Sequence, residues 1–361
     1  MSKQKLIFLV SNDLVTDQRM SKIASTLAHE YDVELWGRRL QKSAPTLPSN
    51  YVQKRFSFLF TRGKFFYLEM NIRYFFSLLF KKVDIISVVD CDTLLAGFFA
   101  AKCKSSKLVF DAHEYYSEVP ELVGRKRIQS IWKAIENKFI PKLKNTYTVN
   151  NSLAQLFLDK WGTQFEVIRN VPVKKIVESN TLENKTILYQ GAVNIGRGLQ
   201  ELIDTLANND QYKLKICGSG DILKELQKHK TNANISNVDF EGQINPIQLY
   251  QFTKDAWCGV NLLENKGLNY YYSLANKFWD YACAGKPQIC MDFPEYKALN
   301  EEFEVAVLIP DLKVETIRCA INTLEDEAFY AKLQSNCRKL IEHNNWHIES
   351  QKLLTFYKNL E

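Results

Sequence analysis

Apolar and polar residues alternate along this chain with two periods. Short continuous apolar runs, as at residues 6–10 and 83–89, are bounded by polar loops and predict buried strands. Between such runs apolar residues recur every three or four positions, as across residues 20–27, which predicts helices. Strands that alternate with helices indicate an α/β fold with a parallel sheet.

This alternation is interrupted once and then resumes. Residues 1–172 are expected to form an N-terminal Rossmann-like domain. Residues 173–184 are polar and lack apolar periodicity, which predicts a linker. Residues 185–344 repeat the pattern and are expected to form a second Rossmann-like domain, and residues 345–361 are expected to form a last helix. A length of 361 residues suits two domains of ordinary size.

The composition is that of a soluble globular protein, with 46% hydrophobic and 24% charged residues. The balance of 47 basic against 41 acidic residues favours anionic ligands, but no dense basic block or nucleic-acid module is present, so no nucleic-acid partner is expected. Eight scattered cysteines, without a Cys-x-x-Cys pair, predict reduced thiols in a cytoplasmic protein. No cluster has metal-ligand spacing, so no bound metal is expected.

The apolar runs are too short for a membrane span. The run at residues 6–10 is better interpreted as a first buried strand than as a signal peptide, and the run at 75–80 is far shorter than the roughly 20 residues that a spanning helix needs. An integral membrane protein is therefore not expected.

Residues 54–82 interleave aromatic and basic side chains, and Glu69 is the single acid among them. One interpretation is a helical stretch at the interface of an anionic bilayer. An equally good one is a core helix whose long basic side chains cover its rim. Base stacking on nucleic acid is a weaker third option.

A short helix that Gly285 and Pro287 end carries the strongest candidate chemistry. Asn276 and Lys277 fall in its first turn, where unpaired N–H groups and the positive end of the helix dipole suit a phosphate. Asp280 lies one turn deeper on the same face, where it can accept hydrogen bonds from sugar hydroxyls. The pattern predicts a nucleotide held by its diphosphate and ribose; the alternative is that Lys277 and Asp280 form a surface pair.

Polar residues also follow several predicted strands, at the edge where parallel sheets bind ligands. His113 follows the strand 107–110 and lies between Asp111 and Glu114, which can orient and tune its ring. The first loop contains Asn12, Asp13, Asp17 and Arg19, and a cap or turn role is the better interpretation of Asp13.

Two glycine-bearing loops open helices in the second half of the chain. The loop at 191–198 contains Arg197, whose guanidinium suits a diphosphate clamped through two hydrogen bonds. The loop at 218–221 follows the next strand. Glycines allow both backbones to approach a ligand closely.

In these motifs the chain resembles the GT-B-fold retaining glycosyltransferases, and family 4 in particular. The resemblance lies in the order and spacing of residues 111–114, 189–199, 218–220 and 273–287. It implies two Rossmann-like domains that face each other across a cleft, with a C-terminal helix that crosses back to the first domain.

The resemblance implies three sets of site residues. The catalytic set is His113, Arg197 and Lys277. The donor-binding set is Gly191, Gly218, Gly220, Glu264, Asn269, Tyr272, Ser273, Leu274, Asn276 and Asp280. The acceptor-binding set is Asn12, Asp13, Arg19, Asp111 and Glu114. No metal or cofactor is implied beyond a UDP- or GDP-sugar as co-substrate.

Three positions depart from the family pattern. The paired acids, eight residues apart, are here Tyr272 and Asp280, so one acid is missing and the other is Asp in place of Glu. Ala192 replaces an arginine that often follows the first loop glycine, and Asn12-Asp13 replaces a glycine pair. Diphosphate binding is therefore expected, whereas the donor sugar would need another ligand, for which Glu264 and Asn269 are candidates.

The expected function is transfer of a hexose-type sugar, with retention, from a nucleotide sugar to a lipid-linked or surface-polysaccharide acceptor. The expected location is the cytoplasm, with peripheral contact between residues 54–82 and the inner face of the cytoplasmic membrane. A sugar-nucleotide 2-epimerase and a non-catalytic GT-B partner subunit are the alternatives.

Overall fold

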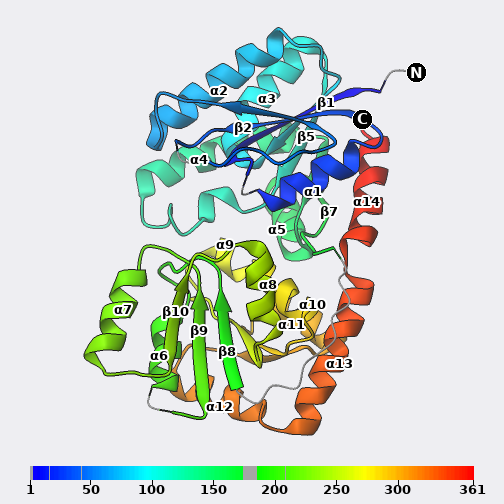
Figure 1. Ribbon diagram of the computed structural model, residues 1–361. Helices are drawn as coiled ribbons and strands as arrows, with labels where there is room; N and C mark the ends of the chain where they lie inside the picture. Colours follow the sequence, from blue (N-terminus) through cyan, green and yellow to red (C-terminus); the bar gives the residue numbers. More distant parts are fainter. Residues whose placement is uncertain (1–2, 16, 42, 174–184, 208) are drawn as a thin grey trace. The chain divides into compact units, whose positions relative to one another are not determined.

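The computed structural model describes residues 3–15, 17–41, 43–173, 185–207 and 209–361. The chain divides into two compact units (Figure 1). Unit 1 consists of Met1–Asn170 and Glu349–Glu361, and unit 2 of Val171–Ile348. Residues 174–184, which make up nearly all of the predicted linker, lie outside the described residues.

Unit 1 contains a seven-stranded parallel sheet in the order β3-β2-β1-β4-β5-β6-β7. Its strands are β1 (Lys5–Asp13), β2 (Asp32–Arg38), β3 (Val52–Phe56), β4 (Ile85–Val89), β5 (Lys107–Ala112), β6 (Asn145–Thr148) and β7 (Glu166–Val167). Its helices are α1 (Gln18–Leu27), α2 (Gly63–Leu79), α3 (Asp90–Lys104), α4 (Lys126–Phe139), α5 (Asn151–Trp161) and α14 (Trp346–Lys358), with short 3-10 turns at Tyr116–Glu118 and Ile140–Lys142.

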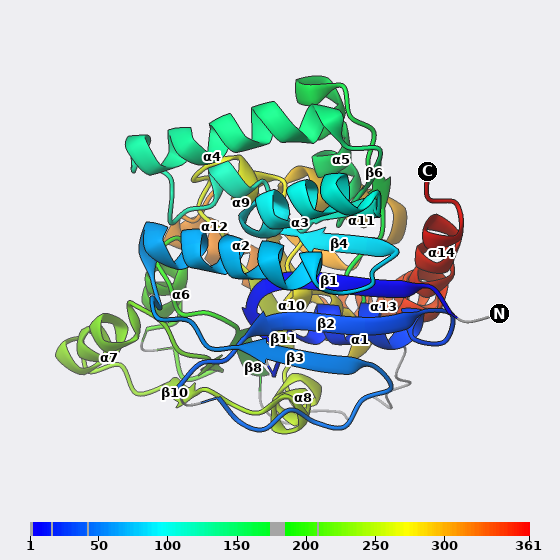
Figure 2. The same cartoon turned by 90° about the horizontal axis from the view of Figure 1, so that it is seen from above.

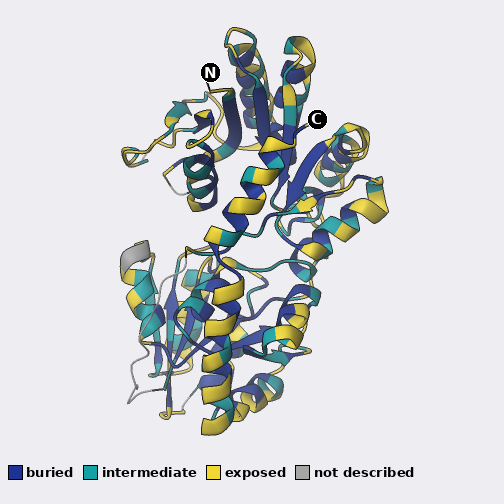
Figure 3. Ribbon diagram, turned by 90° about the vertical axis from the view of Figure 1, so that its right-hand side faces the viewer, coloured by how far each residue is buried: buried dark blue, intermediate teal, exposed yellow. Residues whose placement is uncertain are grey.

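Helices cover both faces of this sheet. A Cβ on Gly97 of α3 would lie 2.1 Å from a methyl carbon of Val88, so α3 packs almost directly on β4. Ser87 points to the opposite face because side chains alternate along a strand, and there the Tyr357 hydroxyl of α14 donates to its Oγ at 3.0 Å. The C-terminal helix thus belongs to unit 1 from Glu349 onward and packs on its sheet, as predicted. Figure 3 shows the buried strands and the exposed outer sides of the helices.

Unit 2 contains a six-stranded parallel sheet in the order β10-β9-β8-β11-β12-β13. Its strands are β8 (Lys185–Gln190), β9 (Tyr212–Cys217), β10 (Val238–Gly242), β11 (Cys258–Asn261), β12 (Gln288–Met291) and β13 (Ala306–Ile309). Its helices are α6 (Leu199–Leu206), α7 (Leu223–Asn232), α8 (Pro246–Lys254), α9 (Leu268–Tyr271), α10 (Asn276–Cys283), α11 (Pro294–Phe303), α12 (Val314–Thr323) and α13 (Glu327–His343).

Both sheets have the doubly wound strand order in which the chain reverses direction across the sheet after its third strand. The reversal falls between β1 and β4 in unit 1 and between β8 and β11 in unit 2. Ligands of such sheets bind beyond the carboxyl ends of the strands at this point, because the flanking loops diverge there. The loops after β1, β4, β8 and β11 are therefore the first places to look for a site.

Two edge strands were not predicted. β3 lies within the aromatic and basic stretch, and its Lys54 amine stacks 4.3 Å from the Trp36 ring centroid on β2. β13 has only four residues, too few for periodicity to identify. Among the described helices, none combines the length and apolar character that crossing a bilayer requires.

Tyr357→Phe tests how α14 is held on unit 1. Loss of the buried hydroxyl leaves Ser87 without this donor, so the free energy of unfolding should fall by about 1 kcal/mol. Tyr51→Phe is the matched control because its hydroxyl donates to Ser21 at an exposed position. Urea denaturation of both variants measures the effect, and equal losses would show that the buried contact has no special role.

Candidate functional site

Lys277 lies buried in the first turn of α10, which begins after Ala275 without a side-chain cap. Its side chain is 8% exposed, and its Nζ has no hydrogen-bond partner among the described residues. The amine lies 3.7 Å from the centroid of the Tyr189 ring on β8. Lys277 therefore does not form the exposed surface pair with Asp280 that was the alternative interpretation of this helix.

The surroundings of Lys277 disfavour its charged form. Burial lowers the pKa of its amine well below 10.5, and the positive charge of Arg197 lowers it further, against a smaller opposing effect of Asp280. A buried amine normally has an acidic partner or loses its proton. Lys277 is thus poised to take up a proton when an anion arrives.

Arg197 is the second cation of this region and lies in the loop after β8. Its Cζ lies 4.8 Å from the centroid of the Tyr270 ring. Its Nε is buried and has no hydrogen-bond partner in the described part of the chain. Two buried donors without acceptors lie near the first turn of a helix, an arrangement suited to an anion.

Glycines bring the loops after β8 and β9 into direct contact. A Cβ on Gly218 would lie 1.8 Å from the carbonyl oxygen of Gly191, and one on Gly220 would lie 2.3 Å from that of Val193. The Val193 N–H also donates to Ser219 O at 3.0 Å. A Cβ on Gly191 would lie 3.7 Å from Lys277 Nζ, so this glycine keeps the space beside the amine open.

Asp280 is held by a short hydrogen-bond chain. Gln190 Nε2 donates to Asp280 Oδ2 at 2.8 Å, and Thr253 Oγ1 donates to Gln190 Oε1 at 2.8 Å. Gln190 is 3% exposed and ends β8. The sequence analysis did not single it out, although its place at the carboxyl end of a strand was a usable signal.

The other predicted donor residues follow β11. Glu264 pairs with Lys266, and its N–H donates to Gly196 O at 2.9 Å, which joins this segment to the Arg197 loop. Asn269 is buried, Tyr272 and Leu274 are half-buried, and Asn276 is exposed. The Ser273 hydroxyl donates to Tyr270 O at 2.9 Å.

In unit 1, His113 lies just beyond β5 in a network of charged groups. Its Nε2 lies 2.9 Å from Asp111 Oδ2 and 2.8 Å from Arg19 Nε. The guanidinium of Arg19 also pairs with Asp111 at 3.1 Å, and both side chains are buried. The structure thus brings Arg19 of the first loop beside Asp111 and His113, which the sequence analysis selected in a different segment.

The Nε2 atom of His113 cannot form hydrogen bonds to Asp111 and Arg19 at the same time. Nε2 donates to Asp111 when it is protonated and accepts from Arg19 when it is not. Burial alone would lower the pKa of His113, but the carboxylates of Asp111 and Asp90 outweigh it and raise the pKa. The two carboxyl groups thus shift the balance toward the charged ring, in which Nε2 donates to Asp111.

Asp90, at the start of α3, is a site residue that the sequence analysis missed. Its Oδ1 accepts from the His113 N–H at 2.8 Å, and its Oδ2 lies 3.8 Å from Nδ1 of the same ring. Burial raises the pKa of Asp90 to about 8. The second carboxylate beside His113 is thus Asp90, whereas Glu114 is exposed. The signal was an acid directly after a strand that pairs with β5.

The polar side chains of the first loop mainly stabilise the loop itself and its contacts with neighbouring segments. Asp13 is buried, and its carboxylate accepts from the N–H groups of Val15 and Leu40 and lies 3.6 Å from Arg55. Asp17 caps α1, and Asn12 donates to Asp17 at 3.3 Å. These contacts match the turn role that the sequence analysis preferred for Asp13.

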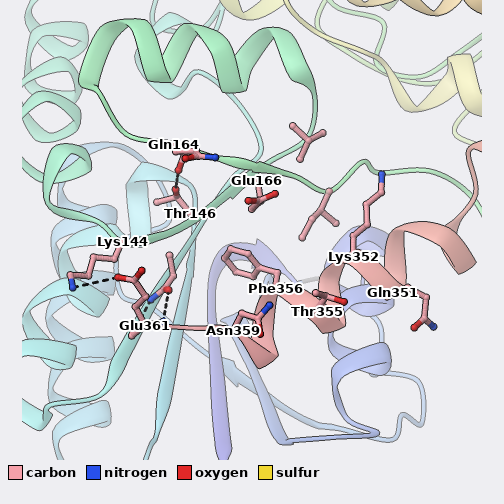
Figure 4. Close-up of a pocket in the computed structure, with 13 residues that line it drawn as sticks. Lys144, Thr146, Gln164, Glu166, Gln351, Lys352, Thr355, Phe356, Asn359 and Glu361 are labelled. Atoms are coloured by element: carbon pink, nitrogen blue, oxygen red, sulfur yellow. Dashed lines mark hydrogen bonds and ion pairs between the residues drawn. The ribbon is translucent and has the colours of Figure 1, made fainter.

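A pocket of about 630 Å³ lies elsewhere in unit 1, between the edge of the sheet and α14 (Figure 4). Thr146, Glu166 and Phe356 are among its lining residues. Lys144 and Glu361 at its rim already pair at 3.5 Å. None of the site residues named above lines it, so it is not the candidate site.

Comparisons with known proteins bear on the family and the fold. Residues 173–342 match the family described as "Glycosyl transferases group 1". The alpha-monoglucosyldiacylglycerol synthase of Streptococcus pneumoniae (strain ATCC BAA-255 / R6) is 24% identical over 178 residues, which cover 45% of this chain and 40% of the relative. The matched region thus spans less than half of that relative.

Two solved structures resemble nearly the whole chain. Sucrose-phosphate synthase (tll1590) from Thermosynechococcus elongatus has a TM-score of 0.82 at 16% identity, with 99% of this chain and 98% of that chain covered. Anabaena Alr3699/HepE in complex with UDP and glucose has a TM-score of 0.77 at 15% identity, with 99% and 100% covered. The predicted resemblance is confirmed: this chain has the GT-B fold, and residues 173–342 match the glycosyl transferases group 1 family.

Proposed function

We propose that this chain is a retaining glycosyltransferase that takes a hexose-type sugar from a nucleoside diphosphate. The observation that carries this proposal is the pair Lys277 and Arg197, whose buried Nζ and Nε have no hydrogen-bond acceptor among the described residues. They occur beside glycine loops at the switch point of the unit 2 sheet, where a ligand is expected. The relative solved with UDP and glucose has the same fold, which supports a UDP-sugar donor.

The reaction requires above all that the negative charge on the leaving diphosphate is stabilised. As the bond from the sugar carbon to the diphosphate oxygen breaks, negative charge grows on that oxygen. Lys277, Arg197 and the first turn of α10 would stabilise this charge from fixed positions. Asp280, already oriented by Gln190, would accept hydrogen bonds from the ribose hydroxyls.

Retention follows most simply from displacement on one face of the sugar. The acceptor oxygen bonds to the sugar carbon on the side from which the diphosphate departs, and the acceptor proton passes to the leaving phosphate oxygen. His113 of unit 1 is the group proposed to contact the transferred sugar, and Asn12, Asp13, Arg19, Asp111 and Glu114 belong to the proposed acceptor region. Glu264 and Asn269 are the proposed substitutes for the missing acid at Tyr272.

We infer a lipid-linked or surface-polysaccharide acceptor at the inner face of the cytoplasmic membrane. The name of the relative, alpha-monoglucosyldiacylglycerol synthase, supports a lipid acceptor. The aromatic and basic residues of 54–82 support a location at a membrane surface.

Turnover with a panel of donors tests this function. UDP-glucose, UDP-galactose, UDP-N-acetylglucosamine and GDP-mannose are each incubated with diacylglycerol and monoglycosyl-diacylglycerol in vesicles, and products are detected by mass spectrometry. Transfer from one donor is expected. An epimer formed without acceptor would identify a 2-epimerase, and binding of UDP without turnover of any donor would favour a non-catalytic subunit.

Lys277→Met should separate binding from stability. The variant loses a hydrogen bond to a charged group, so UDP binding should weaken by about 1.5–3 kcal/mol. It also removes an unpartnered buried amine, so unfolding without nucleotide should require about 1–3 kcal/mol more. Calorimetry and thermal unfolding measure the two effects.

Lys286→Met is the matched control for this experiment. Lys286 is 1% exposed, its Nζ also lacks a hydrogen-bond partner among the described residues, and burial lowers its pKa. Its replacement should stabilise the chain while leaving UDP affinity unchanged. Equal UDP affinity in wild type and Lys277→Met would show that Lys277 is not part of the nucleotide site.

A further inference from the structure

Helix α2 carries apolar side chains on two opposite faces. Its inner face, formed by Phe66, Met70, Tyr74 and Leu78, is buried against unit 1. Four more apolar side chains, between 46% and 57% exposed, follow one another at helical spacing: Phe65, Leu68, Ile72 and Phe76. At about 100° per residue these four form one stripe nearly opposite the buried one. This second stripe contributes little to the core.

The loop before α2 extends this stripe. Leu59 is 88% exposed, and the ring of Phe60 lies 5.3 Å from that of Phe65. Both backbone N–H groups donate to the carboxylate of Glu69 at 3.0 Å, so the loop is held against the helix. We call Leu59, Phe60, Phe65, Leu68, Ile72 and Phe76 the outer α2 patch.

The charge around the outer α2 patch is positive. Arg62, Lys64 and Lys82 are exposed basic residues within residues 54–82. Glu69, the single acid of that range, already accepts from the loop and pairs with Arg73 at 3.1 Å. The patch therefore combines exposed apolar surface with a positive rim, as peripheral membrane-binding surfaces do.

Helix α4 adds to the same side of unit 1. The Trp132 ring of α4 lies 5.2 Å from the Tyr67 ring of α2, and Figure 2 shows α2, α3 and α4 in a row. Near its start α4 has the exposed basic run Arg125, Lys126 and Arg127. Ile128 and Ile131, which are 44% and 58% exposed, follow this run.

We propose that the outer α2 patch and the start of α4 dock unit 1 on the surface of an anionic lipid bilayer. The apolar side chains would enter the interface, and the basic residues would contact lipid phosphates. A second copy of the chain is a poorer occupant, because self-association would bring two positive rims together. The inference rests on the membrane location in the proposed function and names the surface responsible, and docking itself requires no turnover.

Vesicle flotation of the full chain tests this docking. The vesicles contain phosphatidylcholine alone or with about one-third phosphatidylglycerol, and the variant is Leu68→Ser/Ile72→Ser. Wild type should float with the anionic vesicles, far less with the neutral ones, and less as salt rises. The variant should bind anionic vesicles roughly tenfold more weakly, because two half-exposed apolar side chains are removed from the interface.

Leu47→Ser/Leu158→Ser is the matched control, since it changes two exposed leucines of unit 1, 80% and 42% exposed, outside the patch. Equal binding by wild type and the Leu68→Ser/Ile72→Ser variant, equal loss in the control, or no preference for anionic vesicles would overturn the proposal. So would a wild-type dimer in light scattering that the patch variant dissociates. Unchanged UDP affinity in the patch variant keeps a failure of docking distinct from a failure of donor binding.

Discussion

The buried amine of Lys277 is the constraint on which the rest of unit 2's site depends. An amine that is almost fully withdrawn from water raises the free energy of the fold unless an anion or an acid accompanies it. No described group accepts a hydrogen bond from it, and its nearest neighbours are an aromatic ring and the open backbone at Gly191. The glycines after β8 and β9 bring the two loops into close contact beside it, and Arg197 adds a guanidinium whose Nε has no acceptor among the described residues. Each of these features fits the proposed diphosphate site.

In unit 1, by contrast, the charged side chains are paired with one another. Arg19 is paired with Asp111, and His113 lies between Asp111 and Asp90, so these groups have partners within the unit. Such a network fixes the position and protonation of a ring without requiring a ligand. The two units thus differ: unit 2 has buried nitrogen donors without acceptors among the described residues, and unit 1 has an imidazole held by charged neighbours.

Much of this could be predicted from sequence because periodicity and chain order determine it. The order of strands and helices, the loops at the carboxyl ends of strands, and the place of Lys277 in the first turn of α10 follow from local patterns. Burial of that amine depends on packing against Tyr189, which is distant in sequence, and no local pattern reports it. The same holds for Gln190 and Asp90, which become site residues only when neighbouring strands bring them beside Asp280 and His113. The exposed stripe of α2 has the same composition as a core stripe, so only the structure separates the two.

The most direct test of this account is the proton balance of UDP binding. The pKa of Lys277 is lowered in the free protein, so its amine is largely neutral at a pH between that value and its ordinary 10.5. A bound diphosphate favours the ammonium and raises this pKa, so the complex should take up a proton in that range. Calorimetric titration in buffers of different ionisation enthalpy measures this uptake directly. Proton uptake at a pH below 10.5 that disappears in Lys277→Met is predicted, and UDP binding with no proton uptake at any pH would contradict the account.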